Sequence, residues 1–516
     1  MADSKKLKKG LNTKAKNNVI IGAIIAVVIV AVVGYMIYIS GFATRVMTGM
    51  KITNVTPEGK TVVVDNVSVA ELNLHYYQVL NTYYSQGVIT GDTDLDAVLD
   101  ETTGKTLKQT LYDEAADEIK NIYYLLEWGK VNVPNYQDLK EVAQHYMDVS
   151  IDNLRDTSKS YGYPSVNNYL QAMYGTGVSL RVYRSVIEEQ ILAELLQNYV
   201  QQFQFSADKA DLQKTHDENP LTYMRADVNA YAFSAESTTD EDGTVVFDNT
   251  SALEKANKVA EQATDPLTFN LAVMDLIDDP DTLAQFETAD DPTLQSGITT
   301  SWTSSLAGGI MQDFVFETGE IGTCQVFELE SVVWVVLLND RYENNEDTVT
   351  YRTLVLYNDK RAADGCTEAQ IAAGADKLEV KANEIVASIT DEQSFAAAVG
   401  RSSSNINDVI DGGLSDGMTY EDYSTSDGSE IPTATLQLRD WLFDANRQPG
   451  DMTVIRNVSN TTVTIYYFVD SVPAWMYIAE QQVITTRTNI WSQDQEFLPS
   501  TAGVQIAYEL AEKLTY

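Results

Sequence analysis

The side chains that most often carry acid–base, nucleophilic or metal chemistry are few and scattered in this sequence. They are His75, His145, His216, Cys324 and Cys366. The phosphate-binding motif GxxxxGKS/T and the motifs HExxH and CxxC do not occur. The acidic run DEDG at 240–243 lacks the spacing of a calcium-binding loop. The sequence therefore indicates no metal ion and no cofactor.

The composition limits the class of protein. A chain of 516 residues is long enough for about three or four domains. Asp and Glu outnumber Lys and Arg by 75 to 35, so we expect no binding to nucleic acid, which requires basic side chains to neutralise phosphates. The two cysteines could pair in an oxidising compartment, but two isolated cysteines fix no connectivity.

The first 39 residues indicate a membrane anchor. Residues 1–18 carry six lysines and one aspartate, and residues 19–39 form an uncharged run of 21 residues. About 20 apolar residues in a helix span a bilayer core, and a flanking lysine cluster stays in the cytoplasm. We predict a single-pass protein of the cell membrane with its bulk outside the cytoplasm. The alternative is a cleaved signal peptide, whose apolar core has only about 7–15 residues.

Apolar periodicity predicts a helical domain over residues 60–220. One continuous stripe at three- and four-residue spacing consists of Leu107, Leu111, Ala115, Ile119, Ile122 and Leu126. All three histidines fall within this region, where we interpret them as surface or half-buried helix residues. The stripes themselves are most simply core. The 29 tyrosines of the chain allow a second hypothesis, in which exposed aromatic rings hold unfolded polypeptide segments.

The second half of the chain contains an internal repeat. The segment from Asp265 to Phe269 corresponds to the segment from Asp391 to Phe395, 126 residues later. Each follows an alanine-rich helical stretch, and each precedes an aromatic segment and two strand-like runs. We predict two small α+β domains with antiparallel sheets, at 225–342 and 348–472, followed by a helical segment at 475–516.

Several segments together resemble the SurA and PrsA foldases. The run VDNVSVAELNLHYYQ and the later run YPSVNNYLQAMYGTGVSLRVYR resemble their helical chaperone domain. YRTLVLY at 351–357 resembles the first strand of a parvulin (PpiC-type) prolyl isomerase, and DGGLSDG at 411–417 resembles the family's glycine turn. The resemblance implies an α+β multidomain protein: a membrane helix, an all-α chaperone domain and two parvulin-like domains, the first degenerate. By analogy, residues 475–516 would pack back on the N-terminal helices.

The resemblance also implies a candidate pocket, but with departures. Parvulins line their pocket with two histidines, a cysteine or aspartate, and apolar side chains, whereas neither unit here contains a histidine. Thr353, Ser404 and Thr464 stand near the three polar positions, and Trp441 and Phe443 near the pocket aromatics. In the first unit, the last position falls near Trp334. The hydroxyls either preserve a weaker catalytic network or mark a binding module that no longer catalyses.

The resemblance therefore predicts a membrane-anchored, extracytoplasmic folding factor. Its partners would be unfolded or nascent secreted polypeptides, with residues 19–39 in the membrane. Prolyl isomerase activity is left open because the catalytic histidines are absent. The alternative is a non-catalytic surface interaction or scaffold protein that reuses the parvulin fold.

Overall fold

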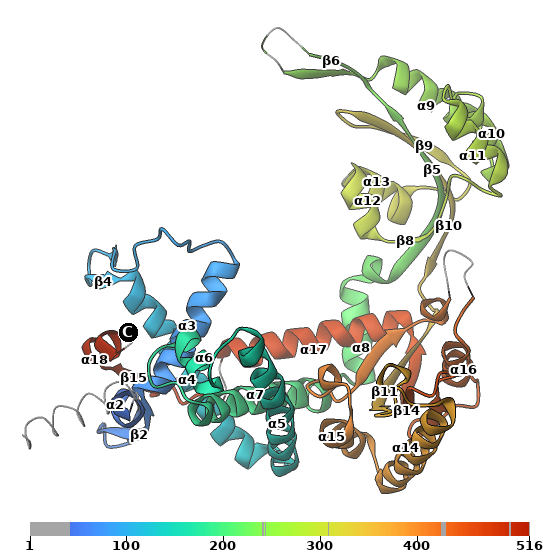
Figure 1. Cartoon of the computed structure of the whole chain (residues 1–516). Helices are drawn as coiled ribbons and strands as arrows, with labels where there is room; N and C mark the ends of the chain where they lie inside the picture. Colours follow the sequence, from blue (N-terminus) through green and yellow to red (C-terminus); the bar gives the residue numbers. More distant parts are fainter. Residues whose placement is uncertain are drawn as a thin grey trace, which may run out of the picture.

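The computed structural model describes residues 42–514, apart from 240–241, 243, 308, 425–429 and 495–496. The described chain forms an N-terminal domain of helices around a small sheet, followed by two units that each contain a four-stranded sheet. In Figure 1 the first unit projects from the rest of the molecule at the end of two long strands, while the second lies beside the N-terminal helices.

The structure corrects the predicted membrane topology. Residues 19–39 lie outside the described residues. Within the described part of the chain, no helix has the length and apolar composition needed to cross a bilayer. Long helices such as α4 (Leu107–Asn132) and α7 (Leu180–Phe203) carry charged side chains along their length. This finding corrects two predictions. One is the fold class, which included a membrane helix, and the other is the location in the cell membrane.

The helices of the N-terminal domain begin where the sequence supplies caps. Ser68 and Glu71 form a capping box at the start of α3 (Val69–Ser85), and Thr106 and Gln109 form another at the start of α4. The apolar stripe of α4 turns inward, so that Leu111 and Ala115 are fully buried. The other helices before the first unit are α2 (Phe42–Val46), α5 (Tyr136–Ser160), α6 (Val166–Tyr174), α7 and α8 (Lys209–Glu218).

The N-terminal domain was predicted to be all-α, but it contains a three-stranded antiparallel sheet. Its strand order is β15-β1-β2, with β1 at Thr48–Val55, β2 at Thr61–Ser68 and β15 at Gly503–Ile506. After the long helix α17 (Ala474–Asp494), the chain returns to pair β15 with β1 and ends in α18 (Tyr508–Leu514). A four-residue strand whose partner lies some 450 residues away in the chain leaves no local signal in the sequence.

The two units have the same sheet topology. In the first, the order is β8-β5-β10-β9, and in the second it is β12-β11-β14-β13, so that corresponding strands occupy corresponding places. All neighbouring strands are antiparallel. The strands are β5 (Met224–Ser234), β8 (Leu294–Ile298), β9 (Cys324–Glu328), β10 (Val332–Glu343), β11 (Asp347–Tyr357), β12 (Leu414–Met418), β13 (Met452–Arg456) and β14 (Thr462–Pro473).

Helices cover both sheets in the same order. The first unit also has an extended hairpin of β6 and β7. The helices and hairpin strands are β6 (Glu236–Thr239), β7 (Val245–Asp248), α9 (Thr250–Gln262), α10 (Pro266–Met274), α11 (Pro280–Thr288), α12 (Thr300–Ala307), α13 (Gly309–Asp313), α14 (Glu368–Ser388), α15 (Glu392–Ser402) and α16 (Thr433–Leu442).

The repeated sequence marks the same local structure in both units. Asp265 caps α10 and Asp391 caps α15, each by accepting a hydrogen bond from the main-chain N–H three residues later. Phe269 and Phe395, four residues after these caps, are fully buried. A polar cap followed at this interval by an aromatic core residue fixes both the start and the rotation of the helix.

Candidate functional site

Thr353 and Thr464 lie on one face of the second unit's sheet. Thr353 in β11 is opposite Tyr466 in β14, and Val355 is opposite Thr464. Directly opposite residues of antiparallel strands point to the same face, and alternate residues of one strand share a face. The opposite face carries Leu354 and its apolar neighbours, which pack against α14 and α15. The structure therefore brings two of the three predicted polar positions together.

Aromatic side chains cover the same face. Phe468 in β14 lies 6.3 Å from Trp441, measured between ring centroids, at the end of α16. Phe443 lies 6.2 Å from Tyr423, which belongs to a short 3-10 turn over the sheet. Both Trp441 and Phe443 are half-buried, so each ring keeps part of its surface open to solvent. We call this surface of β11, β14, α16 and the 3-10 turn the aromatic face.

Burial keeps the hydroxyls of Tyr423 and Tyr466 on the aromatic face neutral at physiological pH. The hydroxyls of Tyr351 and Tyr423 share a hydrogen bond of 3.1 Å, and burial raises the pKa of Tyr423. Burial also raises the pKa of Tyr466 to about 12. Arg447 lies over the Trp441 ring at 4.3 Å. The tyrosine and threonine hydroxyls can donate and accept hydrogen bonds, but they are poor general bases at neutral pH.

Ser404, the third predicted polar position, serves a different purpose. It is exposed, just after α15, and its hydroxyl accepts a hydrogen bond of 3.1 Å from the main-chain N–H of Tyr357. Its own N–H donates to the carbonyl of Val355 at 2.6 Å. Ser404 thus extends the hydrogen bonding along the edge of β11, and this hydroxyl is already engaged with the main chain.

The first unit has no comparable pair of hydroxyls at the corresponding positions. Trp334 lies edge-on to Trp302 at 6.2 Å and packs on the apolar cluster that fills this side of the sheet. In the sheet register, Thr353 corresponds to Ala230 of β5, which is opposite Val336 in β10 and belongs to the same apolar cluster. The face that carries hydroxyls in the second unit is therefore apolar core in the first.

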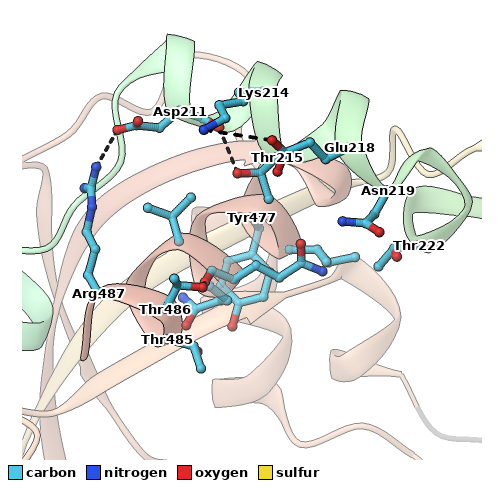
Figure 2. A pocket seen from close by; sticks show the side chains of 14 residues that line it. Asp211, Lys214, Thr215, Glu218, Asn219, Thr222, Tyr477, Thr485, Thr486 and Arg487 are labelled. Atoms are coloured by element: carbon cyan, nitrogen blue, oxygen red, sulfur yellow. Dashed lines mark hydrogen bonds and ion pairs between the residues drawn. The ribbon is translucent and has the colours of Figure 1, made fainter. Parts of the chain in front are cut away.

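A further cavity lies at the base of the first unit. It has a volume of about 860 Å³ and lies between α8 and α17. Figure 2 shows Asp211 of α8 reaching across it to Arg487 of α17, a pair at 2.6 Å, with Tyr477 in its floor. Half of the lining side chains are neutral Thr, Asn and Gln. Sequence reasoning missed this cavity because its two walls are far apart in the chain.

The histidines and cysteines contribute to packing in the described structure. His216 stacks on Tyr223 and its Nε2 lies 2.7 Å from the carboxylate of Glu343, at the junction between the first unit and the rest. His75 is buried in α3. Cys324 and Cys366 are both free thiols, and burial raises the pKa of Cys324 to about 12.

No protein-family model matches this chain, and a search of curated proteins found no similar sequence. The resemblance to SurA, PrsA and the parvulins stays a prediction, and a function for this chain has to rest on its own residues and their geometry.

Proposed function

We propose that this chain is a folding factor that binds unfolded polypeptides, and that the aromatic face of the second unit is a binding site for them. The observation that carries the proposal is the pairing of two half-buried rings, Trp441 and Phe443, with neutral hydroxyls on one sheet face. Such a surface offers large contact areas to apolar or proline-containing segments and hydrogen bonds to their main chain.

The same chemistry favours binding over catalysis. Rotation about a prolyl bond meets a barrier of roughly 18–20 kcal/mol, which a catalyst must lower by stabilising the twisted amide better than the planar one. Thr353 and Thr464 provide neutral hydroxyls where parvulins place histidines, and the hydroxyl of Ser404 is engaged with Tyr357. We therefore propose that the second unit holds its segment without accelerating isomerisation.

We expect the whole chain to leave proline cis/trans exchange in a short peptide at its uncatalysed rate, which corresponds to tens to hundreds of seconds. NMR exchange spectroscopy on the peptide, with and without the protein, measures this directly. Faster exchange that disappears in the Phe443→Ala variant would show that the hydroxyl-lined face catalyses after all.

We expect the Trp441→Ala variant to bind an unfolded polypeptide at least about 10-fold more weakly, since buried aromatic anchors commonly contribute about 2 kcal/mol or more to an interface. Reduced, carboxymethylated α-lactalbumin is a suitable unfolded probe, and its affinity can be measured by fluorescence anisotropy. The matched control is Trp302→Ala, which removes a tryptophan of similar burial from the first unit. We expect this control to change the affinity less than about twofold.

The same experiment separates the proposal from a scaffold function. A scaffold that reuses this fold would neither bind the unfolded probe nor suppress aggregation of a denatured protein. Binding that is equal in the wild-type chain and in Trp441→Ala would keep the folding factor but move its site away from the aromatic face.

A further inference from the structure

A second groove lies in the N-terminal domain, far from the aromatic face in the chain. It has a volume of about 470 Å³ and lies between β2, α3, α4 and α7. A cavity of this size is within the range of small-ligand or side-chain pockets. We call it the acidic groove after its carboxylates, which are Asp65, Glu71, Glu127 and Glu189.

The charges of the acidic groove are poorly balanced. Lys130 is its one basic amino group and pairs with Glu127. Glu71 accepts a hydrogen bond from the Ser68 N–H as part of the α3 cap. Among the described residues, none forms a hydrogen bond or ion pair with Glu189. Glu189 is an exposed side chain at the rim of the groove, and partial desolvation together with the charges of Glu71 and Asp65 raises its pKa. The groove is thus a site of negative potential that a cation would relieve.

Part of the wall of the acidic groove is aliphatic. Ile119 and Val186 are buried side chains that face it, with Ile122 and Leu126 beside them. His75 also lines the groove, with only 4% of its surface exposed. Its Nδ1 lies 3.3 Å from the Gln190 amide nitrogen and 3.5 Å from the Glu118 carboxylate. The groove therefore combines aliphatic contacts with the carboxylates described above.

One wall of the groove is a strand edge. β2 is an outer strand of its sheet and pairs only with β1 among the described strands. Four consecutive residues of β2, from Val64 to Val67, line the groove. The register shift between Ile52 and Thr53 leaves Val64 without a partner in β1, so β2 is bulged where it meets the groove and its side chains there do not alternate regularly. A free edge beside a pocket is a recurring way to hold an extended polypeptide.

From charge, aliphatic wall and strand edge together, we propose that the acidic groove binds extended segments of unfolded polypeptide that carry lysine or arginine next to aliphatic residues. The cationic group would lie among Glu71, Glu127 and Glu189, its neighbours against the aliphatic wall, and its main chain along β2. This inference rests on the proposed function and names a substrate class for it.

The test uses the full chain and fluorescent peptides that repeat Ala-Val-Lys, or the same peptide with glutamine or glutamate in place of lysine. We expect the lysine peptide to bind at least about 10-fold more tightly than the glutamine peptide, and the difference to shrink as salt is raised. We expect Glu189→Lys to remove the preference. Its matched control is Glu194→Lys, which makes the same charge change on α7 but about 140° around the helix.

The outcomes separate this inference from the proposed function. A preference for lysine that survives in Glu189→Lys would overturn the inference, because the net charge of −40 would then be its cause. Equal binding of all three peptides would also overturn it. In either case, binding of the unfolded α-lactalbumin probe that depends on Trp441 would leave the proposed function intact. Failure of that probe to bind would instead remove the proposed function, on which the inference rests.

Discussion

Replacing Arg352 by methionine should lower the free energy of unfolding by about 3 kcal/mol, because it breaks a buried ion pair and leaves several polar partners unsatisfied. Only 1% of the Arg352 surface is exposed. Its Nε donates to Glu392 at 2.9 Å, and its Nη1 donates to the carbonyls of Asp411 and Gly412 at 2.9 and 3.2 Å. Its Nη2 donates to the amide oxygen of Gln202 in α7 at 2.9 Å.

The expected cost stays near the lower end of the range for buried pairs because Glu392 keeps 30% of its side chain exposed. Urea unfolding followed by tryptophan fluorescence and circular dichroism measures the change. Arg401→Met is the matched control. Arg401 also joins the second unit to the N-terminal helices, through Asp138 at 3.9 Å, but both side chains are largely exposed. We expect that control to cost less than about 1 kcal/mol. A cost for Arg352→Met no larger than the control's would contradict this account of how the second unit is held.

The second large effect is expected for Gly413→Ala, which we predict to destabilise the chain by about 3 kcal/mol or more. Gly413 has φ +73°, a left-handed conformation that costs an alanine roughly 1–2 kcal/mol. In addition, a Cβ at this position would lie 2.1 Å from the main-chain oxygen of Thr353, so the backbone itself would have to move. The main-chain oxygen of Gly413 accepts the Thr353 N–H at 2.8 Å, and the displacement would disturb β11 beside the aromatic face.

A second glycine separates the two contributions. Gly365 has φ +76°, but a Cβ there would meet no atom within 4 Å. Gly365→Ala should therefore show only the conformational cost, about 1 kcal/mol. Both variants can be measured by the same urea titration. If the two substitutions proved equally costly, the close approach between Gly413 and β11 would not be the cause.

Local sequence patterns predicted several of the helices and strands but not their assembly. The apolar stripe of α4 and the capped helices starting after Asp265 and Asp391 follow from spacing alone, since a cap and a period of 3.6 residues act within one helix. The strand β11 also follows from its alternation. The pairing of β15 with β1 depends on residues at opposite ends of the described chain.

The candidate site was predictable only in part, for related reasons. Thr353 and Thr464 share a face because their strands are neighbours, which the repeated order of elements suggested. The engagement of Ser404 with the edge of β11 depends on where the chain leaves α15, which no motif specifies. The role of Arg352 was hidden because its partner Gln202 belongs to a helix of another domain. The acidic groove likewise requires four separate elements to meet.

The central claim, that the chain binds unfolded polypeptide at the aromatic face, is tested most directly by hydrogen–deuterium exchange of the full chain with and without reduced, carboxymethylated α-lactalbumin. The account predicts slower amide exchange in α16 and in the 3-10 turn at Tyr420–Tyr423 when the unfolded probe is bound, and loss of this protection in Trp441→Ala. Unchanged exchange throughout these segments at saturating probe would contradict it.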